Sequence, residues 1–90
     1  MQSPQEPEAL ALGALGWLLT DEKRADRLLS LTGLTPDILR ERLTDRSVQA
    51  AVLEFLTNYE PDLLGAAEAL DVSPETLIDA HRKLGGAMHS

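Results

Sequence analysis

The chain has 90 residues and a formal net charge of −7, with 43% hydrophobic and only 3% aromatic residues. This length suits one small domain with a thin core and leaves no room for separate catalytic and regulatory domains. The sequence contains no cysteine, which excludes a disulfide framework, a thiolate zinc site and a cysteine nucleophile. We therefore expect a single helical domain over residues 1–90, with flexible ends at about residues 1–6 and 86–90.

Leucine and alanine supply most of the apolar residues, whereas valine and isoleucine are few. This composition favours helices over strands. Proline, glycine and capping residues also divide the chain at regular intervals. The sequence therefore predicts an all-α fold, a compact bundle of five to six short helices.

The first predicted helix begins between residues 3 and 8 and ends near Leu19. It is apolar nearly all round, so it is either wrapped by the rest of the chain or shared with a second chain. The second helix begins after a cap at Thr20 or Asp21. It ends at Gly33, because glycine suits the left-handed position that follows a helix.

The third predicted helix is capped by Thr35, has Pro36 in its first turn and ends near Leu43. The fourth begins after Asp45, and its apolar residues fall at helical spacing on one face, which we expect to be core. These residues are Val48, Ala51, Val52, Phe55, Leu56 and Tyr59.

The fifth predicted helix has Pro61 in its first turn. Its expected inner side consists of Leu63, Leu64, Ala66, Ala67 and Leu70. The sixth helix follows a cap at Ser73 and ends at the glycine pair 85–86.

The two halves of the sequence can be aligned by placing residues 34–37 over residues 72–75. The apolar positions of the two halves then mostly agree, which suggests an internal repeat of two three-helix halves. Few positions are identical, however, so chance similarity between two leucine-rich helical segments stays open beside true duplication.

The negative charge is concentrated in the second half, because residues 47–81 contain seven acidic and no basic side chains. Such a segment serves either as a solubilising surface or as a face that attracts a basic partner. We take six of these residues as the candidate interaction surface. They are Glu54, Glu60, Asp62, Glu68, Glu75 and Asp79.

Residues 63–85 resemble a helix-turn-helix, with a small residue in the first helix, a tight turn and apolar residues that pack back. A DNA-binding helix-turn-helix needs cations that contact the phosphates, and side chains at the start of its second helix that bond to base edges. This segment has Glu75 and Asp79 there, and only Arg82 and Lys83 at the far end. We therefore expect a packing unit and disfavour nucleic acid as a partner.

The sequence shows no catalytic or cofactor-binding pattern. The only histidines, His81 and His89, lie eight residues apart and would need carboxylate partners to hold a metal. No serine lies in a nucleophile-elbow pattern. We expect no enzyme, no cofactor and no metal site, and we place His81 at the half-buried edge of the core.

The longest stretch without a polar side chain, residues 9–19, is shorter than the minimum of about 17 residues that an untilted helix needs to cross a bilayer. The residues before it are acidic and contain no lysine or arginine, unlike a secretory signal. We therefore expect a cytoplasmic protein that makes no contact with the membrane.

Four segments together resemble a domain-of-unknown-function family of short all-helical proteins from alphaproteobacteria. They are Leu15-Gly16-Trp17-Leu18, residues 29–36, Val52-Leu53-Glu54-Phe55-Leu56 and Glu60-Pro61-Asp62-Leu63-Leu64. The resemblance implies a compact bacterial helical domain that occupies the whole protein. It supplies no activity, cofactor or functional residue.

Two functions follow from these observations as hypotheses. The first is a non-catalytic protein-interaction module, which either docks a basic protein partner on the acidic segment or self-associates as a homo-oligomer through the first helix. The alternative is a transcription-associated protein that contacts nucleic acid through the degenerate helix-turn-helix at residues 63–85.

Overall fold

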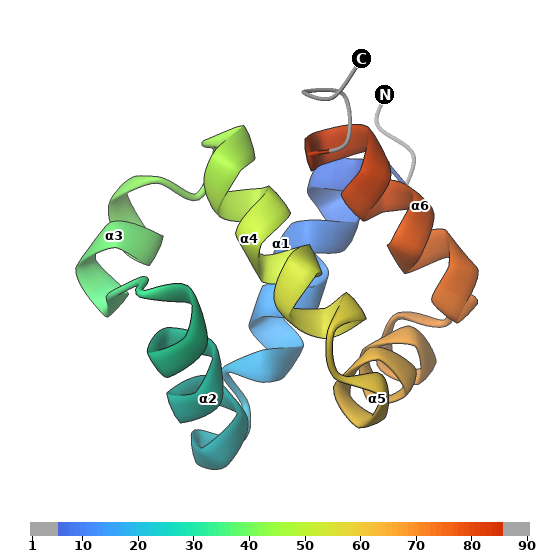
Figure 1. Cartoon of the computed structure of the whole chain (residues 1–90), viewed down its shortest axis with the longest axis horizontal. Coiled ribbons are helices and arrows are strands. Elements are labelled where there is room, and N and C mark those ends of the chain that lie inside the picture. Colours follow the sequence, from blue (N-terminus) through green and yellow to red (C-terminus); the bar gives the residue numbers. More distant parts are fainter. Residues whose placement is uncertain (1–5, 86–90) are drawn as a thin grey trace.

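The computed structural model describes residues 6–85, which fold into six helices (Figure 1). The helices are α1 (Pro7–Leu18), α2 (Glu22–Thr32), α3 (Pro36–Glu41), α4 (Arg46–Thr57), α5 (Glu60–Leu70) and α6 (Pro74–Gly85). No strand occurs within residues 6–85, so the predicted all-α class is confirmed. The predicted flexible ends lie outside the described residues, apart from Glu6.

The predicted caps fix where three helices begin. Asp21, and not Thr20, caps α2 by accepting a hydrogen bond of 3.0 Å from the amide of Lys23. Thr35 caps α3, and Asp45 caps α4. Asp45 accepts hydrogen bonds from the hydroxyl and the amide of Ser47, and these bonds lower the pKa of its carboxyl group. Local side-chain chemistry thus determines the start of each of these helices.

The two halves of the chain repeat the same sequence of elements. In the alignment that places residues 34–37 over 72–75, both ends of α2 coincide with those of α5, and α3 and α6 begin at the same position. The second helix of each half ends at a left-handed residue, Gly33 with φ 74° and Asp71 with φ 58°. The third helix of each half is preceded by a hydroxyl cap, Thr35 or Ser73. These matches favour a repeated three-helix unit over chance similarity.

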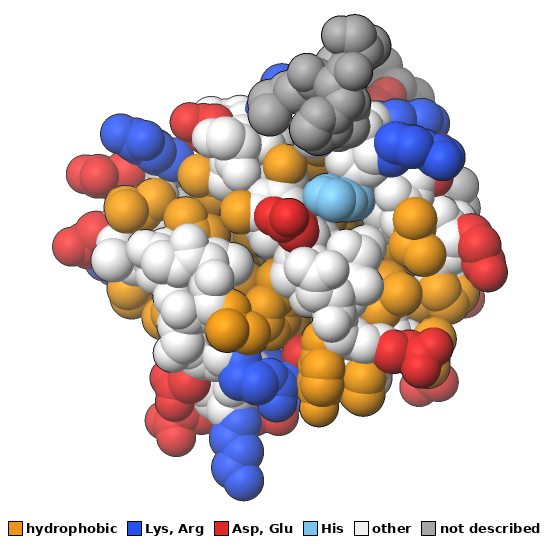
Figure 2. All heavy atoms as spheres, in the orientation of Figure 1, with side chains coloured by type: hydrophobic (Ala, Val, Ile, Leu, Met, Phe, Trp, Pro, Cys, Tyr) orange, Lys and Arg blue, Asp and Glu red, His pale blue; other side chains and the backbone are white. Residues whose placement is uncertain are grey.

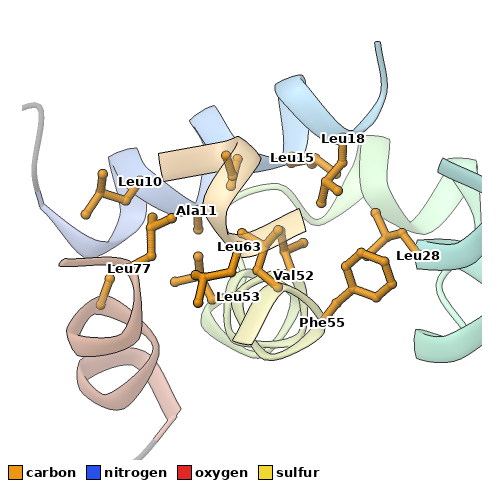
Figure 3. Close-up of a cluster of buried hydrophobic side chains, with 14 of the residues drawn as sticks. Leu10, Ala11, Leu15, Leu18, Leu28, Val52, Leu53, Phe55, Leu63 and Leu77 are labelled. Carbon is orange, nitrogen blue, oxygen red and sulfur yellow. The ribbon is translucent and has the colours of Figure 1, made fainter. Parts of the chain in front are cut away.

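The central helices α1 and α4 separate α2 and α3 on one side from α5 and α6 on the other (Figure 1). Side chains from α1, α2, α4, α5 and α6 meet in one apolar cluster (Figure 3). Leu18 of α1 and Leu56 of α4 are 0% exposed within it. Of the two alternatives for the first helix, the structure shows the wrapped one, because α1 packs against α2, α4, α5 and α6.

The predicted core faces of the fourth and fifth helices need correction at two residues. Tyr59 is exposed because it lies beyond the end of α4, where it precedes α5. Leu64 is 49% exposed because α5 packs on one side only and leaves this side chain facing outward. Conversely, Leu53 and Gln49 are buried, since α4 is surrounded on more than one face.

The third helices of the two halves differ in length and in packing. α6 packs against both central helices, whereas the six residues of α3 contribute only Leu39 to the buried core. α3 also ends before the predicted Leu43, because Arg42 leaves the helical conformation with φ −124° and ψ 33°. The second half therefore has the longer and more fully packed third helix.

Asp71 is a non-glycine residue in the left-handed conformation that Gly33 adopts in the first half. We expect Asp71→Gly to raise the free energy of unfolding by about 0.5 to 1 kcal/mol, because glycine adopts this conformation without a steric penalty. The reciprocal change Gly33→Asp should lower it by a similar amount. Urea denaturation of both variants measures the two effects, and destabilisation by Asp71→Gly would contradict the assignment of strain to Asp71.

Candidate functional site

A groove with a volume of about 510 Å³ lies between α2 and α4. This volume falls within the range of about 300 to 1,000 Å³ that is typical of binding sites. Its lining residues are Arg27, Leu31, Thr32, Ala51, Glu54, Phe55, Asn58 and Tyr59. We call this feature the α2–α4 groove.

The α2–α4 groove combines a buried apolar residue with exposed apolar residues. Phe55 is only 5% exposed and belongs to the core. Leu31 is 75% exposed, more than any other large hydrophobic residue in the described part of the chain, and Tyr59 is also exposed. A site with this composition suits an apolar side chain from another molecule.

Two contacts hold the Arg27 side chain in place within the groove, and one of them compensates its positive charge. Its Nη2 atom donates a hydrogen bond of 2.6 Å to Oδ2 of Asp62, and its guanidinium lies 4.7 Å from the centre of the Tyr59 ring. The hydrogen bond to Asp62 raises the pKa of Arg27 above its ordinary value. Arg27 is therefore committed to an internal ion pair, and Glu54 is the other charged residue that lines the groove.

The same ion pair corrects one predicted surface residue. Asp62 is only 4% exposed, because its carboxylate faces Arg27 of α2 instead of solvent. The burial of Asp62 removes it from any docking surface. The two residues lie on different helices and far apart along the chain, so helical spacing could not reveal the pair.

The remaining predicted acidic residues occupy separate places. Glu54 lines the α2–α4 groove, whereas Glu75 and Asp79 line a second hollow together with Pro7 and Lys83. Glu60 and Glu68 are exposed on α5. Figure 2 shows acidic side chains at several edges of one face, with basic and apolar side chains between them. The acidic side chains of the predicted interaction surface therefore do not surround one common hollow.

In the sequence alignment of the two halves, α2 corresponds to α5 and α4 corresponds to α1. The α2–α4 groove therefore corresponds to the seam between α5 and α1, which also pack together. At this seam Gly65 lies against Trp17, and a Cβ atom on Gly65 would lie 2.6 Å from Cζ2 of the ring. The corresponding pair in the groove is Arg27 and Phe55. A large aromatic ring against a glycine fills the seam, whereas the groove has a smaller ring and an arginine that is drawn toward Asp62.

A second pair of positions shows the same difference. A Cβ atom on Gly13 would lie 2.9 Å from Cδ2 of Leu70, so the leucine side chain covers the α1 backbone closely. The corresponding pair in the groove is Ala51 and Thr32. Threonine is smaller than leucine, and its hydroxyl bonds its own helix at the carbonyl of Leu28. At these two positions the seam is closely packed by its own side chains, whereas the aligned residues line the open α2–α4 groove.

The helix-turn-helix-like hairpin consists of α5 and α6. Its second helix has the acidic Glu75 in its first turn. Asp79, further along this helix, accepts hydrogen bonds from Arg82 and Lys83, which lower the pKa of its carboxyl group. Arg46 of α4 also reaches this helix, but at its other end, where Nη2 donates a bond of 2.9 Å to the carbonyl oxygen of Lys83. The start of α6 therefore gains no cation from these contacts.

The structure also bears on the expected metal chemistry and membrane contact. His81 is partly buried, as predicted, and His89 lies outside the described residues. Residues 6–85 contain no cluster of three or more side chains suited to hold a metal ion. Within the same residues, no helix is long and apolar enough to cross a bilayer.

A family described as Protein of unknown function (DUF3572) matches residues 4–87 of the sequence. The chain belongs to this family. Membership in DUF3572 confirms the predicted family of unknown function with a short helical domain, while the alphaproteobacterial origin stays a prediction. No curated protein gives a significant match to this DUF3572 chain, and neither does any solved structure.

Proposed function

We propose that the chain is a non-catalytic protein-interaction module that binds a partner protein in the α2–α4 groove. The observation that supports this function best is the exposure of Leu31 beside a groove that reaches the buried ring of Phe55. Other exposed leucines, such as Leu19 and Leu64, are not among the residues that line this groove. An apolar side chain at the edge of a hollow is typical of a contact between proteins.

The polar groups of the groove support binding more than catalysis. Thr32 uses its hydroxyl to bond the backbone of Leu28 and Leu34, and Arg27 is paired with Asp62. The eight lining residues include no histidine, serine or cysteine. A nucleophile and a general base within hydrogen-bond distance would be needed for acyl or phosphoryl chemistry.

Capture experiments with cross-linking test this function directly. Three proteins are immobilised separately: the wild type, Leu31→Asp and Leu64→Asp. Each is exposed to a lysate of the organism that encodes the protein, and cross-linked residues are identified by mass spectrometry. We expect a partner that cross-links to α2 and α4 of the wild type and of Leu64→Asp, and that is lost with Leu31→Asp. Leu64→Asp is the matched control, because it places the same charge at another exposed leucine.

Two results would contradict the proposed function. One is the absence of any partner whose cross-links map to α2 and α4. The other is equal capture by all three proteins, which would show that binding does not use Leu31. Circular dichroism of each variant confirms that it is folded before capture.

A further inference from the structure

We infer that the partner of the α2–α4 groove is an amphipathic helix that presents a large apolar side chain next to a lysine or arginine. This inference rests on the proposed function and adds the chemistry of the partner. Three features of the structure support it: the side chains that fill the closed seam, the charges around the groove, and the helical walls.

The seam between α1 and α5, which aligns with the α2–α4 groove in the sequence, is filled by side chains of the chain itself. There the ring of Trp17 and the side chain of Leu70 occupy the space between the helices. In the groove the positions are held by Phe55 and Thr32, which leave that space open to a large apolar side chain from outside. Burial of such a side chain is expected to strengthen binding by about tenfold or more.

Charge around the groove favours a basic partner. The cation of Arg27 is compensated by Asp62, whereas Glu54 lines the groove without an ion pair among the described residues. Glu60 follows Tyr59 directly and is also exposed. A second copy of the chain would bring two charges of −7 together, which repel each other, whereas a lysine or arginine is attracted.

The walls of the groove indicate a helix as the partner element. Both walls are helices, whose backbone amides and carbonyls are already bonded within the helix. They therefore offer no free strand edge for an extended peptide. A helix that lays its apolar face between two helices needs only side-chain contacts.

Fluorescence anisotropy with three labelled helical peptides tests this chemistry. The first peptide carries one leucine flanked by lysines on an otherwise neutral helix, the second has glutamates in place of the lysines, and the third has alanine in place of the leucine. We expect the leucine–lysine peptide to bind about tenfold or more tightly than the alanine peptide. It should also bind at least about threefold more tightly than the glutamate peptide, and the difference should shrink at high salt.

Two variants assign the binding to the groove and to Glu54. Ala51→Leu fills the groove from α4 and should weaken binding of the leucine–lysine peptide by about tenfold. Glu54→Gln should weaken it by about two- to fivefold, as for one partly exposed ion pair. Glu68→Gln is the matched control, because it removes the same charge from α5, and it should leave binding unchanged. Thermal unfolding verifies that each variant is folded.

The outcomes separate the two proposals. Equal binding of the lysine and glutamate peptides, or an equal effect of Glu68→Gln and Glu54→Gln, overturns the basic partner, even where Leu31→Asp still abolishes capture from the lysate. The basic partner is also overturned if sedimentation shows a homodimer that Leu31→Asp dissociates. A second copy of the chain would then occupy the groove. If neither peptide binding nor lysate capture responds to Ala51→Leu and Leu31→Asp, both proposals fail.

Discussion

Replacement of Leu18 or Leu56 by alanine is expected to lower the free energy of unfolding by about 2 to 5 kcal/mol in each case. Both side chains are fully buried, one in each central helix, and they occupy equivalent positions in the two halves. A domain of this size has a total stability of only about 5 to 15 kcal/mol. Each variant should therefore lose a large share of its stability, measured by urea denaturation.

The same experiment distinguishes one cooperative core from two independent halves. Because α1 and α4 pack against each other, Leu56→Ala should unfold in a single transition, with coincident curves from circular dichroism and Trp17 fluorescence. Leu64→Ala is the control, and we expect a change within about 0.5 kcal/mol because this leucine is half-exposed. Separate transitions in Leu56→Ala would show that the halves fold independently.

Gly65→Ala is expected to lower the free energy of unfolding by about 1 to 3 kcal/mol. The added Cβ atom would lie 2.6 Å from Cζ2 of Trp17, and an indole ring cannot bend away from such a contact. The guanidinium of Arg24 covers the same ring at 3.9 Å from its centre, so a shift of the ring also disturbs this contact. Urea denaturation gives the change in stability, and the fluorescence of Trp17 reports the displacement of its ring.

Gly16→Ala provides the matched control for Gly65→Ala. Gly16 lies within α1, and no other group lies within 4 Å of the position that its Cβ atom would occupy. Alanine is the better helix former, so this variant should gain up to about 1 kcal/mol. If Gly65→Ala gains stability as well, Trp17 can move freely and the α1–α5 seam is not closely packed.

The sequence predicts the features of this fold that depend on neighbouring residues. Asp21, Thr35 and Asp45 cap their helices through bonds to amides two or three residues away. Gly33 ends α2 through its own backbone conformation. Such interactions act within one helical turn, so the residue types and their spacing are sufficient to place them.

Features that depend on distant helices could not be predicted in this way. Apolar spacing places both Leu63 and Leu64 toward the core, but only the position of α5 on its neighbours decides that Leu64 is exposed. The burial of Asp62 likewise requires Arg27 from another helix. The exposure of Leu64 and the burial of Asp62 depend on which faces of α5 other helices cover, and the sequence of α5 alone does not specify this.

The candidate site was missed for the same reason, although one signal for it exists. Leu31 follows Leu28 by three residues, a spacing that is typical of a buried face, yet Leu31 is 75% exposed. The signal lies in the comparison of the two halves, where Gly65 corresponds to Arg27 and Leu70 to Thr32. A closely packed pair in one half and a charged or small residue in the other indicate a difference in packing.

The packing of α6 against both α1 and α4 has a consequence for the order of events during translation. α1 leaves the ribosome before α6 and cannot complete its apolar contacts until α6 has been synthesised. Contacts between elements so far apart along the chain also slow folding, because a long loop must close before they form. A ribosome-bound nascent chain is therefore expected to expose the leucines of α1 to chaperones until residue 85 has emerged.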